Sequence, residues 1–291
     1  MRKQTKADIM LLVVVLFWGI SYLLIDVSLT ELETFNLNAF RFLMAFFIAA
    51  IAGAAHLKNV NTLTLRYAAL LGFVLMLVYM GATYGVMYTS LSNAGFLCAL
   101  TVVLTPILCF IIKKEKPQKK LAVSVLLSFV GIALLSLNSQ FRPALGDIFC
   151  FGCALAYSFH LLIIEKAVRC EKVDAFQLGV FQLGFAGFYQ LIVSFLIETP
   201  HLPQSPKVWA AALVLAVFCT GLAFIVQTLA QQYTSATHVG VIFSLEPVFA
   251  AVAAFFFAGE VLSPRAYVGA AMLLMGLFVM EVRIPKKHQI H

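Results

Sequence analysis

The sequence predicts an all-α integral membrane protein, with ten transmembrane helices arranged as two inverted-topology five-helix repeats. Three observations lead to this fold class: the composition, the spacing of the apolar segments and an internal repeat. Apolar residues make up 62% of the 291 residues and charged residues 11%, whereas soluble domains contain roughly half and a quarter. This composition excludes a soluble globular domain.

The chain consists of apolar segments separated by short polar or Pro- and Gly-containing breaks. Each segment is long enough to cross a hydrocarbon core, which needs about 20 apolar residues. The breaks leave no room for a separate soluble domain. The predicted spans are 7–26, 36–55, 67–89, 94–112, 121–137, 145–165, 175–197, 208–231, 236–258 and 264–282.

The basic residues predict the orientation of these spans. Sixteen of the twenty Lys and Arg residues fall at the two ends of the chain and in alternate breaks, three fall on the opposite side, and Arg41 lies within a span. This asymmetry predicts cytoplasmic N- and C-termini. Because the net charge of +7 is spread over short breaks and not gathered in a patch, we expect no nucleic-acid binding. The first apolar segment lacks a cleavage signal and is interpreted as a retained span.

The internal repeat constrains the architecture. A shift of 145 residues places Tyr88-Thr89-Ser90 on Tyr233-Thr234-Ser235, and a shift of 139 places Trp18 on Tyr157. Each half contains five predicted spans, so the two halves enter the membrane from opposite sides. Inverted repeats are typical of secondary transporters, whose sites lie near the midplane between the repeats. The predicted repeats cover residues 7–137 and 145–282.

Three motifs resemble those of a known family: Phe17-Trp18-Gly19, Ser244-Leu245-Glu246-Pro247-Val248 and Gly259-Glu260. Together with the repeat, they make the chain similar over its full length to EamA-type members of the drug/metabolite transporter superfamily. The resemblance implies a central cavity lined mainly by spans 1, 3, 4, 6, 8 and 9. It also implies transport of amino acids, other small metabolites or drugs, often outward.

We therefore expect a secondary transporter that exports a small metabolite, such as an amino acid or an amphipathic compound, by alternating access. Its partners would be that solute, the lipid bilayer and, if Glu246 titrates, protons; it would be a monomer or a homodimer. The absence of an N-x-[ST] acceptor is compatible with a bacterial cytoplasmic (inner) membrane. An intramembrane enzyme, or a channel or receptor, is the alternative, but no HExxH, GxSxG or P-loop motif occurs. We expect no enzymatic activity, cofactor or metal.

Glu246 is the first candidate for the site because it lies midway along the ninth span, next to Pro247. A charged side chain at this depth is costly unless it faces a cavity or a partner. It could couple protons or bind a substrate ammonium group. Alternatively, it could be a structural carboxylate at a helix kink. Its counterpart in the repeat is Thr101, so the carboxylate is not duplicated.

Arg41 is the basic residue within a predicted span. It could clamp a substrate carboxylate, or it could form a structural ion pair with a nearby acidic residue. We favour the ion pair because the second span is usually peripheral to the cavity in the family that the chain resembles. The acidic residues within reach are Asp26, Glu31 and Glu33.

The remaining cavity candidates are polar or aromatic residues on the predicted cavity-lining spans. Gln227 and Gln231 form an uncharged stripe at i, i+4, which should face a cavity or another helix and not lipid. Trp18 and Tyr157 could flank a substrate; a place in the interfacial aromatic belt fits less well, because Trp18 lies well inside its span. The Met/Tyr face of the third span, which includes Tyr84, could be either packing or a binding surface. The full set is Trp18, Tyr84, Thr101, Tyr157, His160, Gln227, Gln231 and Glu246.

Small residues predict close contacts between helices. Gly81-x-x-x-Gly85 in the third span, and Gly131 and Gly276 in the fifth and tenth spans, allow two backbones to approach closely. Cys150 and Cys153 form a CxxC motif within an apolar helix, where we expect ordinary packing and not redox chemistry.

Overall fold

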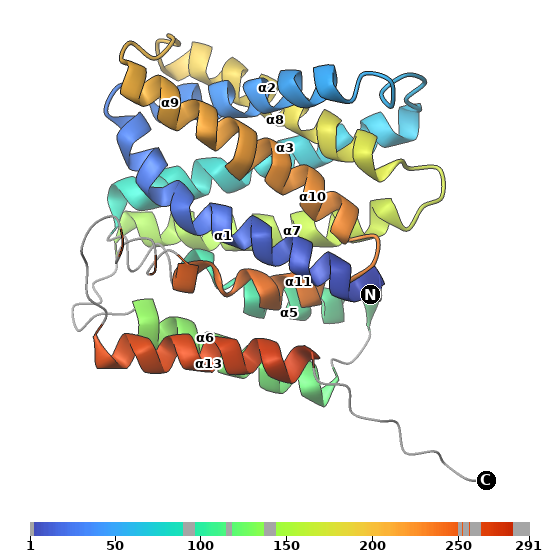
Figure 1. The fold of residues 1–291 in the computed structure, drawn as a ribbon, viewed down its shortest axis with the longest axis vertical. Helices are drawn as coiled ribbons and strands as arrows, with labels where there is room; N and C mark the ends of the chain where they lie inside the picture. The colour runs from blue at the N-terminus through green and yellow to red at the C-terminus, as the bar shows by residue number, and fades with distance from the viewer. Residues whose placement is uncertain are drawn as a thin grey trace.

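The computed structural model describes residues 3–89, 97–114, 118–136, 144–249, 252, 256 and 263–281. All regular secondary structure within these residues is helical (Figure 1), which confirms the all-α prediction for the described part of the chain. The helices are α1 (Lys3–Leu29), α2 (Thr34–Ala52), α3 (Thr62–Tyr88), α5 (Thr101–Lys113), α6 (Lys119–Ser136), α7 (Leu145–Val168), α8 (Ala175–Ile197), α9 (Pro206–Val214), η1 (Leu215–Leu222), α10 (Ala223–Ala230), α11 (Ala236–Phe243) and α13 (Pro264–Glu281).

Six helical segments within the described residues are long and apolar enough to cross a membrane: Lys3–Ser21, Thr34–Ala52, Thr62–Gly85, Leu145–Val168, Ala175–Ile197 and Pro206–Ala230. The predicted fourth, ninth and tenth spans correspond to shorter apolar helices, and the predicted fifth span corresponds to α6. Ten membrane crossings and the inverted arrangement of the halves remain predictions. Ser90 of the repeat and the Gly259-Glu260 motif lie outside the described residues.

Helices α3 and α7 pack through the glycines predicted for this purpose. A Cβ atom added at Gly81 would lie 2.8 Å from the carbonyl oxygen of Phe149, and one added at Gly85 would collide with Cys150 Sγ. Only a residue without a side chain allows this approach. The contact confirms the predicted roles of the glycine pair and of Cys150, which is a buried free thiol.

Helices α6 and α13 lie side by side along one edge of the molecule (Figure 1). A Cβ atom at Gly131 would lie 2.8 Å from Gly269 O, and one at Gly276 would lie 2.9 Å from Ser128 Oγ. The predicted close contact at Gly131 and Gly276 is therefore confirmed. The pair contacts the rest of the molecule through α5 and α11.

The fourth and ninth predicted spans are interrupted at matching positions of the sequence repeat. A turn at residues 99–100 precedes α5, and a turn at residues 244–245 follows α11. Pro247 has no N–H to donate to the carbonyl of Phe243, four residues earlier, and α11 ends at Phe243. The Glu-Pro pair therefore marks a break in the helix, where the sequence suggested only a kink.

A π-helix interrupts the eighth span, where the sequence predicted a regular helix. Segment η1 joins α9 to α10, and the Thr220 hydroxyl donates to the carbonyl of Leu215, five residues earlier, at 2.8 Å. Trp18 Nε1 donates to the carbonyl oxygen of Cys219 at 2.9 Å. Short π segments occur frequently at functional sites, and this one lies against α1 and α2.

The loops at the far end of α1 are held by carboxylates. Glu198 accepts hydrogen bonds from the backbone N–H groups of Phe35 at 2.9 Å and Asn36 at 2.7 Å, at the start of α2. Glu31 accepts from the backbone N–H groups of Gln204 at 2.8 Å and Ser205 at 3.1 Å, just before α9. A negative charge at a helix N-terminus satisfies donors that have no partner within the helix.

Candidate functional site

An aromatic cluster around Trp18 joins α1, α7, α10 and α11. The centroid of the Trp18 ring lies 4.8 Å from that of Phe243, 5.7 Å from that of Phe224 and 5.9 Å from that of Tyr157. Tyr157 and Phe243 are stacked, with an interplanar angle of 6°. The structure therefore brings together Trp18 and Tyr157, the two aromatic counterparts of the sequence repeat.

A chain of hydrogen bonds leads from this cluster along α10. The Tyr157 hydroxyl donates to Gln227 Oε1 at 3.0 Å, and Gln227 Nε2 donates to Gln231 Oε1 at 3.3 Å. Gln231 Nε2 then donates to the carbonyl oxygen of Leu161 at 3.0 Å. Both glutamines are buried. The glutamine stripe thus faces α7 and not lipid.

His160 belongs to a second polar chain, which ties α7 to α8 and α10. Its Nε2 lies 3.1 Å from Gln182 Oε1, and Gln182 Nε2 donates to Thr228 Oγ1 at 2.9 Å. Thr228 Oγ1 donates to the carbonyl oxygen of Phe224 at 2.7 Å. His160 is fully buried and stacks on Tyr157 at 5.6 Å. It therefore supports the ring that faces Trp18.

Arg41 is 1% exposed and contacts the π-helix. Its Nε donates to Thr220 Oγ1 at 2.8 Å, and its guanidinium carbon lies 4.8 Å from the centroid of the Tyr79 ring. A guanidinium over the face of an aromatic ring is a favourable cation–π arrangement. The Tyr79 ring packs edge-on against Phe42 at 4.8 Å.

These contacts correct the favoured structural ion pair. Among the described residues, no ion pair links Arg41 to Asp26, Glu31 or Glu33, and Glu31 instead accepts hydrogen bonds from the loop before α9. The reason is that η1, which is distant in sequence, presents a hydroxyl to the guanidinium. The described contacts of Arg41 are thus with Thr220 and Tyr79, neither of which is an ion pair.

Glu246 begins the short helical stretch that follows the break after α11, and it is partly buried. Its carboxylate lies within electrostatic range of the hydroxyl groups of Tyr79 and Tyr157. The positive charge of Arg41 also acts on Tyr79. The charges of Arg41 and Glu246 therefore both act on Tyr79, whose ring lies 6.1 Å from Phe224 of the Trp18 cluster.

Two sequence candidates lie elsewhere. Thr101 Oγ1 donates to the carbonyl oxygens of Cys98 at 3.0 Å and Ala154 at 3.3 Å, which fastens the start of α5 to α7. Tyr84 packs in a separate aromatic group, whose other members are Phe35, Tyr88 and Phe149. The described contacts of these two residues do not reach Trp18.

The structure adds residues that sequence reasoning did not select. Tyr79 and Phe243 complete the surroundings of Trp18 and Arg41. Neither stands out by residue type in an apolar helix, so the sequence offered no signal. Thr220 lies in sequence on the same side of the eighth span as Gln227 and Gln231, but its contact with Arg41 could not be predicted from that position. Gln182 is different: it falls near Arg41 at a repeat shift of 141, and this correspondence could have identified it.

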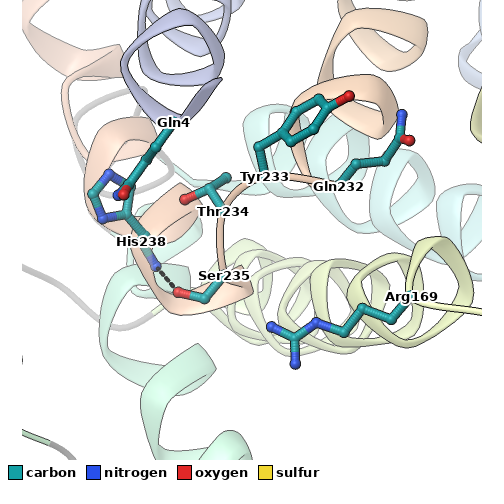
Figure 2. A pocket seen from close by; sticks show the side chains of 7 residues that line it. All are labelled: Gln4, Arg169, Gln232, Tyr233, Thr234, Ser235 and His238. Carbon is teal, nitrogen blue, oxygen red and sulfur yellow. Dashed lines mark hydrogen bonds between the residues drawn. The ribbon is translucent and has the colours of Figure 1, made fainter. Parts of the chain in front are cut away.

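A pocket of about 330 Å³ opens at the end of the bundle where α10 connects to α11 (Figure 2). It lies near the N-terminal end of α1, away from the loops that carry Glu31 and Glu198. Its lining is polar and comes from α1, α7 and the α10–α11 connection. The lining residues are Gln4, Arg169, Gln232, Tyr233, Thr234, Ser235 and His238.

Comparison with known proteins shows which family the chain resembles. The model of the EamA-like transporter family matches residues 5–137 and 144–282. An uncharacterized transporter of Archaeoglobus fulgidus is 30% identical over 97% of this chain and 88% of its own length. The uncharacterized transporter YetK of Bacillus subtilis is 23% identical over 97% of this chain and 88% of its own length.

The fold has a counterpart among solved structures. One crystal structure superposes with a TM-score of 0.81 over 95% of this chain and 96% of that chain, at 16% identity. At this identity the likeness shows the fold alone. The long apolar helices and the family match together define an integral membrane protein. The chain belongs to the EamA-like transporter family, which confirms the resemblance noted in its motifs.

Proposed function

We propose that this protein is a secondary transporter that exports a small zwitterionic or amphipathic metabolite, such as an amino acid, by alternating access. Membership of the EamA-like transporter family supports the general function. The observation that carries the substrate class is the buried guanidinium of Arg41, which lies over Tyr79 near the aromatic cluster of Trp18, with the charge of Glu246 acting on the same tyrosine.

The charge arrangement suits a molecule with one positive and one negative group. A guanidinium has five N–H donors, of which the bond to Thr220 uses one, and it can bind a carboxylate in a bidentate manner; paired charges are much less costly at membrane depth. Glu246 would bind the ammonium group of the same solute. Trp18, Tyr157 and Phe243 would contact its apolar part, and Gln227 would supply a neutral hydrogen bond.

The transport cycle would use the two predicted halves, which rock about a site near the midplane and open it to one side at a time. We place both termini in the cytoplasm and the protein in a bacterial cytoplasmic membrane, on the distribution of Lys and Arg. Export is the direction that we propose. Proton coupling would depend on Glu246.

Counterflow into proteoliposomes without ATP tests the proposal. We expect purified protein to exchange a radiolabelled amino acid, and we expect Arg41→Met and Glu246→Gln to reduce the exchange. The matched control is Lys207→Gln, since Lys207 is exposed and lies in the first turn of α9. If the wild-type protein exchanges none of the amino acids and amphipathic metabolites tested, the proposed substrate class is wrong.

Proton coupling has a separate test. A pH gradient should drive wild-type transport, whereas Glu246→Gln should exchange substrate without a response to the gradient. A variant that keeps both its transport rate and its response to the gradient would exclude Glu246 as the coupling group. A protein that only equilibrates its solute, with no response in the wild type, would be a facilitator.

A further inference from the structure

The polar pocket at the N-terminal end of α1 is bordered by one short helix, α11. Several contacts from other helices converge on the first turn of α11. This helix is eight residues long, and non-helical connections border it on both sides, at residues 231–235 and 244–245. Its first turn faces the pocket (Figure 2), and its far end leads into Glu246. A rigid element with a hinge at each end is suited to moving as a unit.

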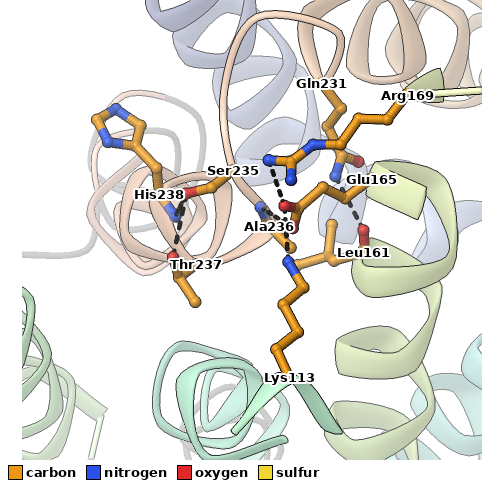
Figure 3. A network of polar contacts seen from close by, with 9 residues as sticks. All are labelled: Lys113, Leu161, Glu165, Arg169, Gln231, Ser235, Ala236, Thr237 and His238. Carbon is orange, nitrogen blue, oxygen red and sulfur yellow. Dashed lines mark hydrogen bonds and ion pairs between the residues drawn. The ribbon is translucent and has the colours of Figure 1, made fainter. Parts of the chain in front are cut away.

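One buried carboxylate fastens the first turn of α11 to α7 and α5. Glu165 is 2% exposed; its Oε2 accepts a hydrogen bond from the backbone N–H of Ala236 at 3.0 Å. Its Oε1 pairs with Lys113 Nζ at 2.8 Å and with Arg169 (Figure 3). Lys113 belongs to α5, and Arg169 follows the end of α7. The carboxylate therefore connects three helices at the inner wall of the pocket.

A second buried carboxylate, on α1, faces a histidine of α11; the two form an ion pair when the histidine is protonated. Asp8 Oδ1 lies 3.1 Å from His238 Nε2, and both side chains are buried. His238 is held in turn by its backbone N–H, which donates to Ser235 Oγ at 3.3 Å. We call the contacts of Asp8 with His238 and of Glu165 with Ala236 the latch.

Polar side chains continue behind the latch toward the proposed substrate site. Gln232 lines the pocket, while its neighbour Gln231 begins the hydrogen-bonded chain that runs through Gln227 to the Tyr157 hydroxyl. Hydrogen-bonding side chains thus lead from beside the pocket to Tyr157, within an otherwise apolar bundle. Such a series provides partners for a polar solute along its path.

The hydrogen bond of Glu165 with Ala236 can be lost at a smaller cost in free energy than its ion pairs with Lys113 and Arg169. If α11 moved away, Glu165 would lose the hydrogen bond from Ala236 but would keep Lys113 and Arg169, which lie on other elements. A buried carboxylate that keeps its ionic partners avoids most of the cost of an unpaired charge. The latch can therefore open without leaving Glu165 unpaired.

We propose that the pocket is the cytoplasmic vestibule of the transport route and that the latch is its gate, opened by displacement of α11. This inference rests on the proposed transport function, because a gate is needed only if a substrate passes through the protein. The latch residues would be positioning residues, which set the balance between closed and inward-open states. They would not contact the substrate in the closed state.

Cysteine labelling can test the gate without a substrate. Cys219 is 1% exposed and lies in η1 beside Trp18, so it reports opening of the bundle as far as the proposed site. The parent variant would keep Cys219 and replace the other five cysteines by Ala. Inverted membrane vesicles would present the cytoplasmic face to a membrane-impermeant methanethiosulfonate reagent.

Two variants remove the Glu165 contact in different ways. Glu165→Ala removes the carboxylate, whereas Ala236→Pro removes the backbone donor, adds the proline ring and keeps the carboxylate. Proline is tolerated at the first position of a helix, and Ser235 already has the extended backbone that precedes proline, with φ −90° and ψ 156°. Since a hydrogen bond to a charged group stabilises one of two states, we expect each variant to raise the labelling rate of Cys219 roughly tenfold.

The controls separate the gate from general loosening of the protein. Glu171→Ala removes an exposed carboxylate at the same end of the molecule and should leave the labelling rate unchanged. Gln232→Trp, which fills the vestibule, should slow the labelling of Cys219 in the Ala236→Pro variant. Folding of every variant would be checked by its thermal unfolding temperature and its elution as a single species.

If the folded Glu165→Ala and Ala236→Pro variants label Cys219 at the same rate as the parent variant, the proposal that the latch is a gate is wrong. An increase seen only in right-side-out vesicles would overturn the cytoplasmic assignment. Unchanged labelling after Gln232→Trp would show that the route does not use this pocket. Because labelling needs no substrate, these failures are distinct from a failure of counterflow, which would overturn the transport function itself.

Discussion

The indole nitrogen of Trp18 donates a hydrogen bond of 2.9 Å to the carbonyl oxygen of Cys219, across 201 residues of sequence. The acceptor lies within η1, and the side chain of Cys219 donates in return to the carbonyl oxygen of Phe17 at 3.3 Å. The first predicted span and the eighth are therefore joined in both directions. This connection fixes the orientation of the ring around which the other aromatic residues gather.

Trp18→Phe should destabilise the protein, because it leaves the Cys219 carbonyl without its indole donor. A buried acceptor that loses its partner costs about 1–3 kcal/mol, and a lower thermal unfolding temperature in detergent would report the loss. Trp209→Phe is the matched control, since Trp209 is only partly buried and its described contact is an aromatic one with Phe40. Equal effects of the two substitutions would contradict a specific role for the Trp18 hydrogen bond.

Arg41 and Thr220 should behave as a coupled pair. Thr220→Val removes the acceptor of Arg41 Nε and should destabilise the protein by about 1–3 kcal/mol. Arg41→Met removes the charge that requires the acceptor, so the double variant should be more stable than the sum of the single effects predicts. Thermal unfolding of the four proteins in this cycle measures the coupling. Simple additivity would mean that the two side chains act independently.

The contact between α3 and α7 predicts a rescue. Gly85→Ala should lower the unfolding temperature, because the added methyl group would collide with Cys150 Sγ. Overpacking of this kind typically costs about 1–3 kcal/mol, and Cys150→Ala in the same chain should restore most of it. Gly152→Ala serves as the comparison, since a Cβ atom there meets no heavy atom within 4 Å. A destabilised double variant would show that another contact is responsible.

Glu31 gives the protein a pH-dependent loop anchor. Hydrogen bonds from the Ser205 hydroxyl and from the backbone N–H groups of Gln204 and Ser205 hold the pKa of Glu31 below its ordinary value of 4.5. A carboxyl group with a lowered folded-state pKa stabilises the protein above its unfolded-state pKa, and this contribution disappears as the pH falls through the folded-state pKa.

The matching measurement compares wild type with Glu31→Gln across pH. The wild type should unfold at the higher temperature at pH 7, and the difference should shrink as the pH falls below 4.5. The side chain is partly exposed and its charge is screened by solvent, so the difference will be small at every pH. A constant difference between pH 7 and pH 3 would mean that the charge of Glu31 does not hold the loop.

The sequence predicted those structural features that depend on the residue pattern of one segment or of the repeat. Composition and apolar spacing predicted the helices, and small residues in helical register identified the α3–α7 and α6–α13 contacts. The repeat related Trp18 to Tyr157, and their rings do lie 5.9 Å apart. The Glu-Pro pair of the ninth span marked an irregular backbone, although the structure shows a helix end and not a kink.

Features that depend on distant segments could not be predicted in the same way. We expected a carboxylate near Arg41 in sequence, but its described partner is Thr220, 179 residues away. The π-helix has no sequence signature here, because its extra carbonyl interactions come from Trp18 on another helix. The contact of Asp8 with His238 joins residues from opposite ends of the chain. Side chains of ordinary type acquire these roles only through packing.

The π-helix also determines how this chain can change in length. A π turn holds more residues than an α turn, so η1 contains a residue that an α-helix of the same rise would not need. Deleting one residue between positions 215 and 222 would therefore restore a regular α-helix while leaving α9 and α10 in nearly the same relative rotation. The change would fall on the backbone around Cys219, whose carbonyl oxygen accepts the hydrogen bond from Trp18 Nε1. A one-residue deletion in η1 is thus expected to preserve the packing of both flanking helices and to alter the support of the Trp18 ring.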